Sequence, residues 1–153
     1  MDSKQRLEKV AKCRGGIISD ATRVEIALDW RLRLYFFPKS NHKAATFHDR
    51  ILNSSQFSFD KKISLYESTN YFRRLKQHKR IKLSLRLIQR YRNALAHWEW
   101  SQWDKGRGEI ILYSPDMSRE VRLSKKHIAE FQEHVNFVLK TFGFKSYQST
   151  WEF

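Results

Sequence analysis

The sequence predicts a mainly α-helical protein with a small C-terminal β-hairpin before its last helix. Residues 77–99 and 125–142 both repeat apolar side chains at the three- and four-residue spacing of an amphipathic helix. Between them, residues 109–113 and 119–123 are two short runs of strand-like composition that flank the turn sequence Ser-Pro-Asp-Met. These segments set the fold class, and shorter patterns give the other elements.

The length and charge of the chain indicate one domain and a polyanionic partner. A chain of 153 residues has the size of a single domain, which we place at residues 17–144 between a basic N-terminal arm (1–16) and a C-terminal tail (145–153). The formal net charge of +14 repels itself in a compact fold, so nucleic acid is the first candidate partner. With 41% apolar residues, the chain is too hydrophobic to be a disordered basic tail.

The cysteine and histidine pattern gives no sign of a metal or of another cofactor. Cys13 is the single cysteine, so no intramolecular disulfide forms and a reducing compartment is expected. No Cys/His array has the spacing of metal ligands. The first residues lack the apolar core of a signal peptide, and no run reaches the roughly 18 apolar residues of a membrane span. We therefore expect a cytoplasmic protein with no membrane partner.

Three helices are expected before residue 77. Ser19 or Asp20 can cap the first, after a hinge at residues 15–16, and Pro38 stops it at about Phe37. The second is indicated by four apolar residues, Ala44, Phe47, Ile51 and Leu52. The third starts near Ser58 and carries the apolar residues Phe59, Ile63, Tyr66 and Phe72.

The helix expected at about residues 77–99 is central, because its apolar arc is broad. This arc contains Ile81, Leu83, Leu85, Leu87, Ile88, Tyr91, Ala94, Leu95 and Trp98. Arg92 falls inside the arc and therefore needs a partner, for which Glu25 and Asp29 of the first helix are candidates. His97 lies in the polar arc, about 140° from Arg92 on an ideal helix. The two side chains converge only if the last turn loosens or a second subunit completes the site.

The C-terminal elements follow from turn and cap residues. Residues 104–108 form a loop before the hairpin. Ser124 caps the last helix and Gly143 is placed to end it. The apolar stripe of this helix, which forms core or dimer surface, consists of Ile128, Phe131, Val135, Val138 and Phe142.

An arginine followed five residues later by a histidine occurs three times, as Arg73/His78, Arg92/His97 and Arg122/His127. A fixed cation beside a proton-exchanging group suits cleavage of a phosphodiester. The first pair lies in a basic connection and the third straddles a strand end and a helix start, so both are interpreted as accidental. The middle pair alone closes a long central helix, with Asn93 directly after the arginine.

At this point the sequence resembles the HEPN family, whose hallmark is R-x4-6-H, often R-N-x-x-x-H, at the end of a core helix. The resemblance covers about residues 17–100, including the apolar first helix (24–37), the segment Ser-Phe-Asp-Lys-Lys-Ile-Ser-Leu (58–65) and Arg-Asn-Ala-Leu-Ala-His-Trp (92–98). It implies an antiparallel helical bundle that forms a homodimer, with two motifs in one cleft. It also implies a metal-independent endoribonuclease of toxin or phage-defence type, with an antitoxin or other regulatory protein as a possible partner.

The resemblance assigns a role to each motif residue. Arg92 would hold the scissile phosphate and stabilise its developing charge, and His97 would exchange a proton with the 2′-hydroxyl or the leaving 5′-oxygen. Asn93 would orient neighbouring groups or hydrogen-bond to them. Glu99 stands where the antitoxin-paired members have tyrosine, so regulation through that tyrosine is not implied. Two other functions remain open, a non-catalytic RNA- or nucleotide-binding module and a helical interaction protein with an acidic partner.

Residues 73–98 hold nine Lys and Arg residues and no acid, which favours a surface that follows an RNA backbone. The residues assigned to it are Arg73, Arg74, Lys76, Lys79, Arg80, Lys82, Arg86 and Arg90. Trp98 is expected to pack in the core. Trp100 and Trp103 either stack on unpaired bases or pack against the hairpin.

Overall fold

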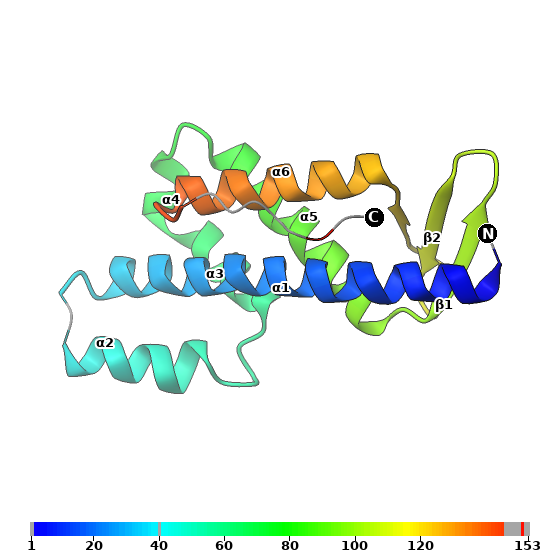
Figure 1. Ribbon diagram of the computed structural model, residues 1–153. Helices are drawn as coiled ribbons and strands as arrows, with labels where there is room; N and C mark the ends of the chain where they lie inside the picture. The colour runs from blue at the N-terminus through cyan, green and yellow to red at the C-terminus, as the bar shows by residue number, and fades with distance from the viewer. Residues whose placement is uncertain (1, 40, 146–150, 152–153) are drawn as a thin grey trace.

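The computed structural model describes residues 2–39, 41–145 and 151, and it confirms a mainly helical protein with a small antiparallel sheet. Figure 1 shows that α1 (Ser3–Phe36) runs the length of the molecule, with α6 (Lys125–Thr141) alongside it and α5 (His78–His97) crossing it obliquely, and both helices contact α1. The short helices are α2 (His42–Phe47), its π-helical continuation η1 (His48–Leu52), α3 (Phe59–Ser68) and α4 (Asn70–Arg74). The strands are β1 (Trp100–Asp104), β2 (Glu109–Tyr113) and β3 (Glu120–Leu123).

α1 begins much earlier than the sequence pattern predicted. Asp2 caps it through a capping box, in which its carboxylate accepts the N–H of Gln5 at 2.8 Å. The predicted hinge at residues 15–16 and the predicted cap at Ser19 or Asp20 are wrong, because α1 continues through both glycines. The face that packs in the core is continuous across them and includes Val10, Cys13, Ile17 and Val24. Residues 3–16 are therefore part of a core helix, and packing outweighs the low helix propensity of glycine.

The predicted caps farther along the chain are confirmed. Ser58 and Ser124 accept N–H groups of the first turns of α3 and α6. Gly143 has a φ of 84° and donates to the carbonyl of Lys140, while Phe144 donates to that of Leu139, which is a Schellman motif. The helix predicted from Ser58 is divided in two, because Thr69 ends α3 and its hydroxyl caps α4.

The sheet has three strands in the order β1-β2-β3, so the prediction of a two-stranded hairpin is incomplete. The predicted pair of strands is confirmed as β2 and β3. The missed strand is β1, which pairs with β2 from Trp100 opposite Tyr113 to Asp104 opposite Glu109. Residue 104 is thus the last residue of a strand, and the loop covers only the turn to β2.

The core is formed mainly by α1, α5, α6 and the inner face of the sheet. Most of the predicted arc is buried, including Trp98, which directly follows α5 and is 7% exposed, whereas Leu83 is wrongly assigned and is 62% exposed. The stripe predicted on α6 is buried in full. In the part of the chain that the structure describes, no helix is both long and apolar enough to span a membrane. The predicted tail, residues 145–153, lies outside the described residues except for Lys145 and Trp151.

Candidate functional site

Arg92 stands at a cleft of about 470 Å³ between α1, α5 and the segment from η1 to α3, which we call the Arg92 cleft. Its guanidinium-bearing side chain is 34% exposed, so it is reachable from solvent despite its place in the apolar arc. The wall formed by the η1–α3 connection is rich in hydroxyl and amide groups. The lining consists of Thr22, Glu25, Ile26, Asp29, Leu52, Asn53, Ser54, Ser55, Phe57, Ser58, Phe59, Lys62 and Arg92.

Two carboxylates and two cations share this cleft. Lys62 Nζ lies 2.8 Å from Glu25 Oε1 and 2.9 Å from Asp29 Oδ2. Arg92 Nη2 lies 3.8 Å from the other oxygen of Glu25. Glu25 therefore bridges the two cations, as predicted for Arg92, whereas Asp29 pairs with Lys62. The four charges balance, so the cleft itself adds nothing to the net charge of the protein.

Lys62 is the residue of this site that the sequence analysis missed. Its side chain is 5% exposed, and a lysine is rarely buried this deeply without a carboxylate partner. Burial raises the pKa of Asp29 above its usual range, and the hydrogen bond from Lys62 opposes that rise. The signal was present in the spacing, because Lys62 lies three residues after Phe59 and four before Tyr66, on the buried face of α3.

His97 is the last residue of α5 and is exposed, and it does not line the Arg92 cleft. The following amide, that of Trp98, donates to the carbonyl of Ala94 at 2.8 Å, so the last turn of α5 is regular. Of the two routes to convergence with Arg92, a loosened last turn is therefore absent. The side chains of His97 and of the half-buried Asn93 make no hydrogen bond or ion pair with the described residues.

The eight basic residues predicted to follow RNA fall into two groups. Arg73, Arg74, Lys76 and Lys79, at the α4–α5 corner, are exposed and make no ion pair with the part of the chain that the structure describes. The four others contact protein groups. Arg80 lies 3.6 Å from Glu133, Lys82 lies 3.8 Å from Glu67, and Arg90 donates to the carbonyl of Glu120.

Arg86 is the most heavily engaged of these cations. Its guanidinium donates to both oxygens of Glu67, at 3.2 and 3.1 Å, and also to Asp60 and Ser64 of α3. These hydrogen bonds, first those to Glu67, raise the pKa of Arg86 above its already high value. Arg86 thus joins α5 to α3, and its donors are occupied by the protein.

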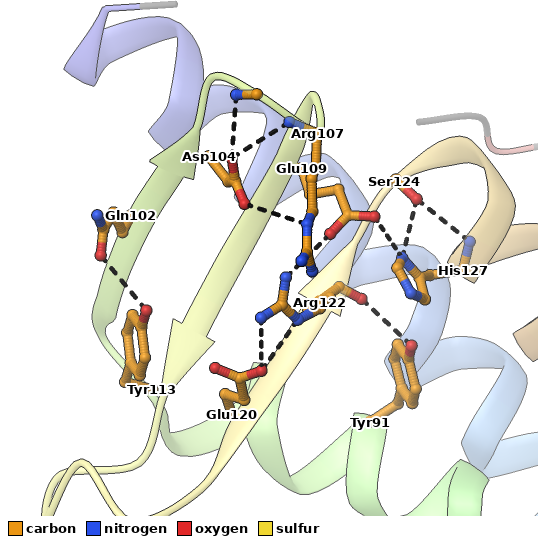
Figure 2. A network of polar contacts seen from close by, with 11 residues as sticks. Tyr91, Gln102, Asp104, Arg107, Glu109, Tyr113, Glu120, Arg122, Ser124 and His127 are labelled. Carbon is orange, nitrogen blue, oxygen red and sulfur yellow. Dashed lines mark hydrogen bonds and ion pairs between the residues drawn. The ribbon is translucent and has the colours of Figure 1, made fainter.

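The third Arg-x4-His pair lies in a polar network beside the sheet, which Figure 2 shows from close by. Arg122 donates to Glu120 at 2.9 Å and to Glu109 at 3.3 Å. His127 Nδ1 lies 2.8 Å from Ser124 Oγ and 3.7 Å from Glu109. Because two carboxylates neutralise Arg122, this network joins β2, β3 and the start of α6 and leaves no free cation at that arginine.

The Arg92 cleft offers a fixed cation and polar walls. Among the residues that the structure describes, no group of three or more His, Cys, Asp or Glu side chains is placed to hold a metal ion. Comparisons with family models, with curated proteins and with solved structures give no match. The function is therefore inferred from the residues and their geometry.

Proposed function

We propose that this protein is a HEPN-like, metal-independent endoribonuclease that acts as a homodimer, as a toxin or phage-defence effector. The observation that carries the proposal is the placement of two motif residues on one rigid helix. Arg92 opens into a polar cleft, and His97, five residues later on another face, is exposed and has no side-chain partner among the described residues. One chain supplies half of a catalytic site, and a two-fold axis supplies the other half.

The chemistry follows from what each side chain can do. Glu25 holds Arg92, whose planar guanidinium would contact two oxygens of the scissile phosphate and stabilise the charge that builds up on phosphorus. One His97 imidazole accepts the proton of the attacking 2′-hydroxyl, and the imidazole of the partner gives a proton to the departing 5′-oxygen. The P–O5′ bond breaks as the P–O2′ bond forms, which yields a 2′,3′-cyclic phosphate and a 5′-hydroxyl.

An exposed apolar stripe beside the cleft supports the homodimer. Ile26, Trp30 and Leu34 lie one turn apart on α1 and are 50%, 42% and 48% exposed. Ile26 also lines the Arg92 cleft, so a second copy that covers the stripe comes to the edge of the cleft. Neighbouring exposed apolar side chains of this kind are typical of protein interfaces.

The test is cleavage of end-labelled RNA with analysis of the new ends. His97→Ala should lower the rate by about 10²- to 10⁴-fold with RNA affinity retained, because a general acid or base moves only a proton. Arg92→Lys should also be severely impaired, since an ammonium cannot replace a planar fork. His42→Ala, at an exposed histidine that begins α2, is the matched control and should cut at the parent rate. A His97→Ala protein as active as the parent, or a strict requirement for a metal ion, would refute the proposal.

A second candidate, a non-catalytic RNA- or nucleotide-binding module, is favoured by one observation. Glu25 neutralises Arg92, so the motif offers a phosphate no unpaired cation, whereas Arg73, Arg74, Lys76 and Lys79 are exposed, make no ion pair with the described residues and are open to RNA. Such a protein would bind RNA with a salt-dependent affinity and leave it intact in the same assay. Binding to an acidic protein in place of RNA would instead indicate the interaction protein.

A further inference from the structure

A groove outside the Arg92 cleft lies where the α4–α5 corner meets the C-terminal end of α6, and we call it the Phe137 groove. Its volume is about 500 Å³, within the range of sites that hold small ligands. Leu75, Lys76, Gln77 and Arg80 form one side, and Phe137 and Lys140 form the other. The groove therefore joins the unpaired half of the predicted basic surface to a helix that is distant in sequence.

The charge at this groove is almost entirely positive. Lys76 and Lys140 are exposed and make no ion pair with the residues that the structure describes. Arg80 has one carboxylate nearby, that of Glu133 at 3.6 Å, and the Glu133 side chain is 74% exposed. Among the residues that the structure describes, none that lines the groove is acidic. Three cations around one concave surface favour a ligand with phosphate groups.

The floor of the groove is a flat surface on which the ring of a ligand can stack. The guanidinium carbon of Arg80 lies 4.1 Å above the centre of the Phe137 ring, and that ring packs against the core. This stack holds the guanidinium plane in place. Unpaired RNA bases commonly stack on aromatic rings and on arginine planes, which are insensitive to base identity.

We infer that the Phe137 groove binds an unpaired nucleotide of single-stranded RNA. The base stacks on the Arg80–Phe137 pair, and Lys76 and Lys140 contact the phosphates on either side of that nucleotide. This inference rests on the proposed function for the identity of the ligand. It adds a second place, outside the cleavage site, at which the protein holds the RNA. The positive surface continues from the groove over the α4–α5 corner, where further RNA phosphates can contact Arg73, Arg74 and Lys79.

The test measures binding of a labelled ten-nucleotide single-stranded RNA by fluorescence anisotropy, on protein that carries His97→Ala so that the RNA stays intact. Adding Lys76→Ala and Lys140→Ala should raise Kd about tenfold and reduce the log–log salt slope by about 1.4, because about 0.7 is lost per phosphate contact of a single strand. The matched control is Lys43→Ala with Lys105→Ala, at two exposed lysines on α2 and in the β1–β2 turn, and its Kd should stay within twofold of the parent.

Stacking is tested separately by Phe137→Leu, which keeps the groove apolar and removes the ring. Its Kd for the single strand should rise at least fivefold, and its Kd for an RNA duplex, whose bases cannot stack there, should not change. Arg80→Lys, which keeps the positive charge and removes the flat guanidinium, provides the same test at an exposed residue if Phe137→Leu melts early.

The failures of the two proposals are distinguishable. If the Lys76→Ala/Lys140→Ala protein binds the single strand as tightly as the control, the groove is refuted while RNA binding and cleavage stand. Tighter binding of polyglutamate than of RNA by the parent would also refute it. If the protein without substitutions neither binds nor cuts RNA at low salt, both proposals are wrong.

Discussion

Replacing Lys62 with methionine tests the ion cluster beneath the Arg92 cleft. Methionine keeps the length of the side chain and most of its volume, so the change removes the charge and leaves the packing nearly intact. Asp29 and Glu25 then lose the ammonium that lies 2.9 and 2.8 Å away, with side chains that are only 5% and 18% exposed. Breaking a buried pair from one side costs about 3–5 kcal/mol, and we expect a loss of this size in the free energy of unfolding at pH 7.

The loss should depend on pH, and the direction follows from Asp29. Burial already raises the pKa of this carboxyl in the folded protein, and removal of Lys62 raises it further. A carboxyl with a raised folded-state pKa favours folding at low pH and loses that contribution as the pH rises through the folded pKa. The deficit of Lys62→Met should therefore be smallest near pH 4, about the pKa of aspartate in an unfolded chain, and grow toward pH 7.

Urea denaturation of the parent and Lys62→Met proteins, at several pH values between 4 and 7, measures this effect. Lys61→Met is the matched control, because Lys61 is exposed and, within the described part of the chain, its ammonium donates to the carbonyl of Gln56 and to no carboxylate. Adding Asp29→Asn to Lys62→Met should recover part of the loss, since one stranded charge is removed. An equal loss in the control, or a deficit that does not change with pH, would show that Lys62 has no special electrostatic role.

Two further predictions concern residues outside the clefts. Arg86→Ala should lower the free energy of unfolding, measured by urea denaturation, by about 1–2 kcal/mol, because it removes the two hydrogen bonds from the guanidinium to Glu67. It should leave the salt dependence of RNA binding unchanged. A flatter salt slope at unchanged stability would instead show that Arg86 contacts RNA. Gly143→Ala should cost about 1 kcal/mol and lower Tm by about 2–4 °C in a calorimetric scan, because an alanine is strained at a φ of 84°. Gly106→Ala is the control, at an exposed turn position with no positive φ, and an equal drop in both would contradict this reasoning.

The helices of this fold could be predicted wherever their signals are local. Ser58 and Ser124 precede helices as caps, and Gly143 ends α6, because each interacts with backbone groups three or four residues away. Local signals also misled, since two adjacent glycines read as a hinge in α1. The burial of Cys13 and Ile17 on the same face as Val24 outweighs the cost of those glycines.

Apart from the acidic partner of Arg92, the pairing of charges could not be predicted, because it depends on which helices meet. Arg86 and Lys62 belong to charged runs that look solvated, yet Arg86 meets Glu67 and Lys62 meets Asp29, 19 and 33 residues away. The sequence therefore predicted Arg92 with an acidic partner on the first helix, and it could not show that Lys62 shares that partner. β1 was missed for a similar reason, since a strand of five residues is defined by its pairing with β2.

The arrangement of α1 also sets the order in which the chain can fold during synthesis. α1 leaves the ribosome before the helices that cover its apolar face, α5 and α6. At about 5–20 residues per second, α5 is complete about 3–12 s after α1. During that interval Ile17, Val24 and Leu28 lack the surfaces that bury them. A nascent chain stalled before residue 78 should therefore remain sensitive to protease and stay bound to chaperones. A chain that includes α6 should be protected and no longer bind them.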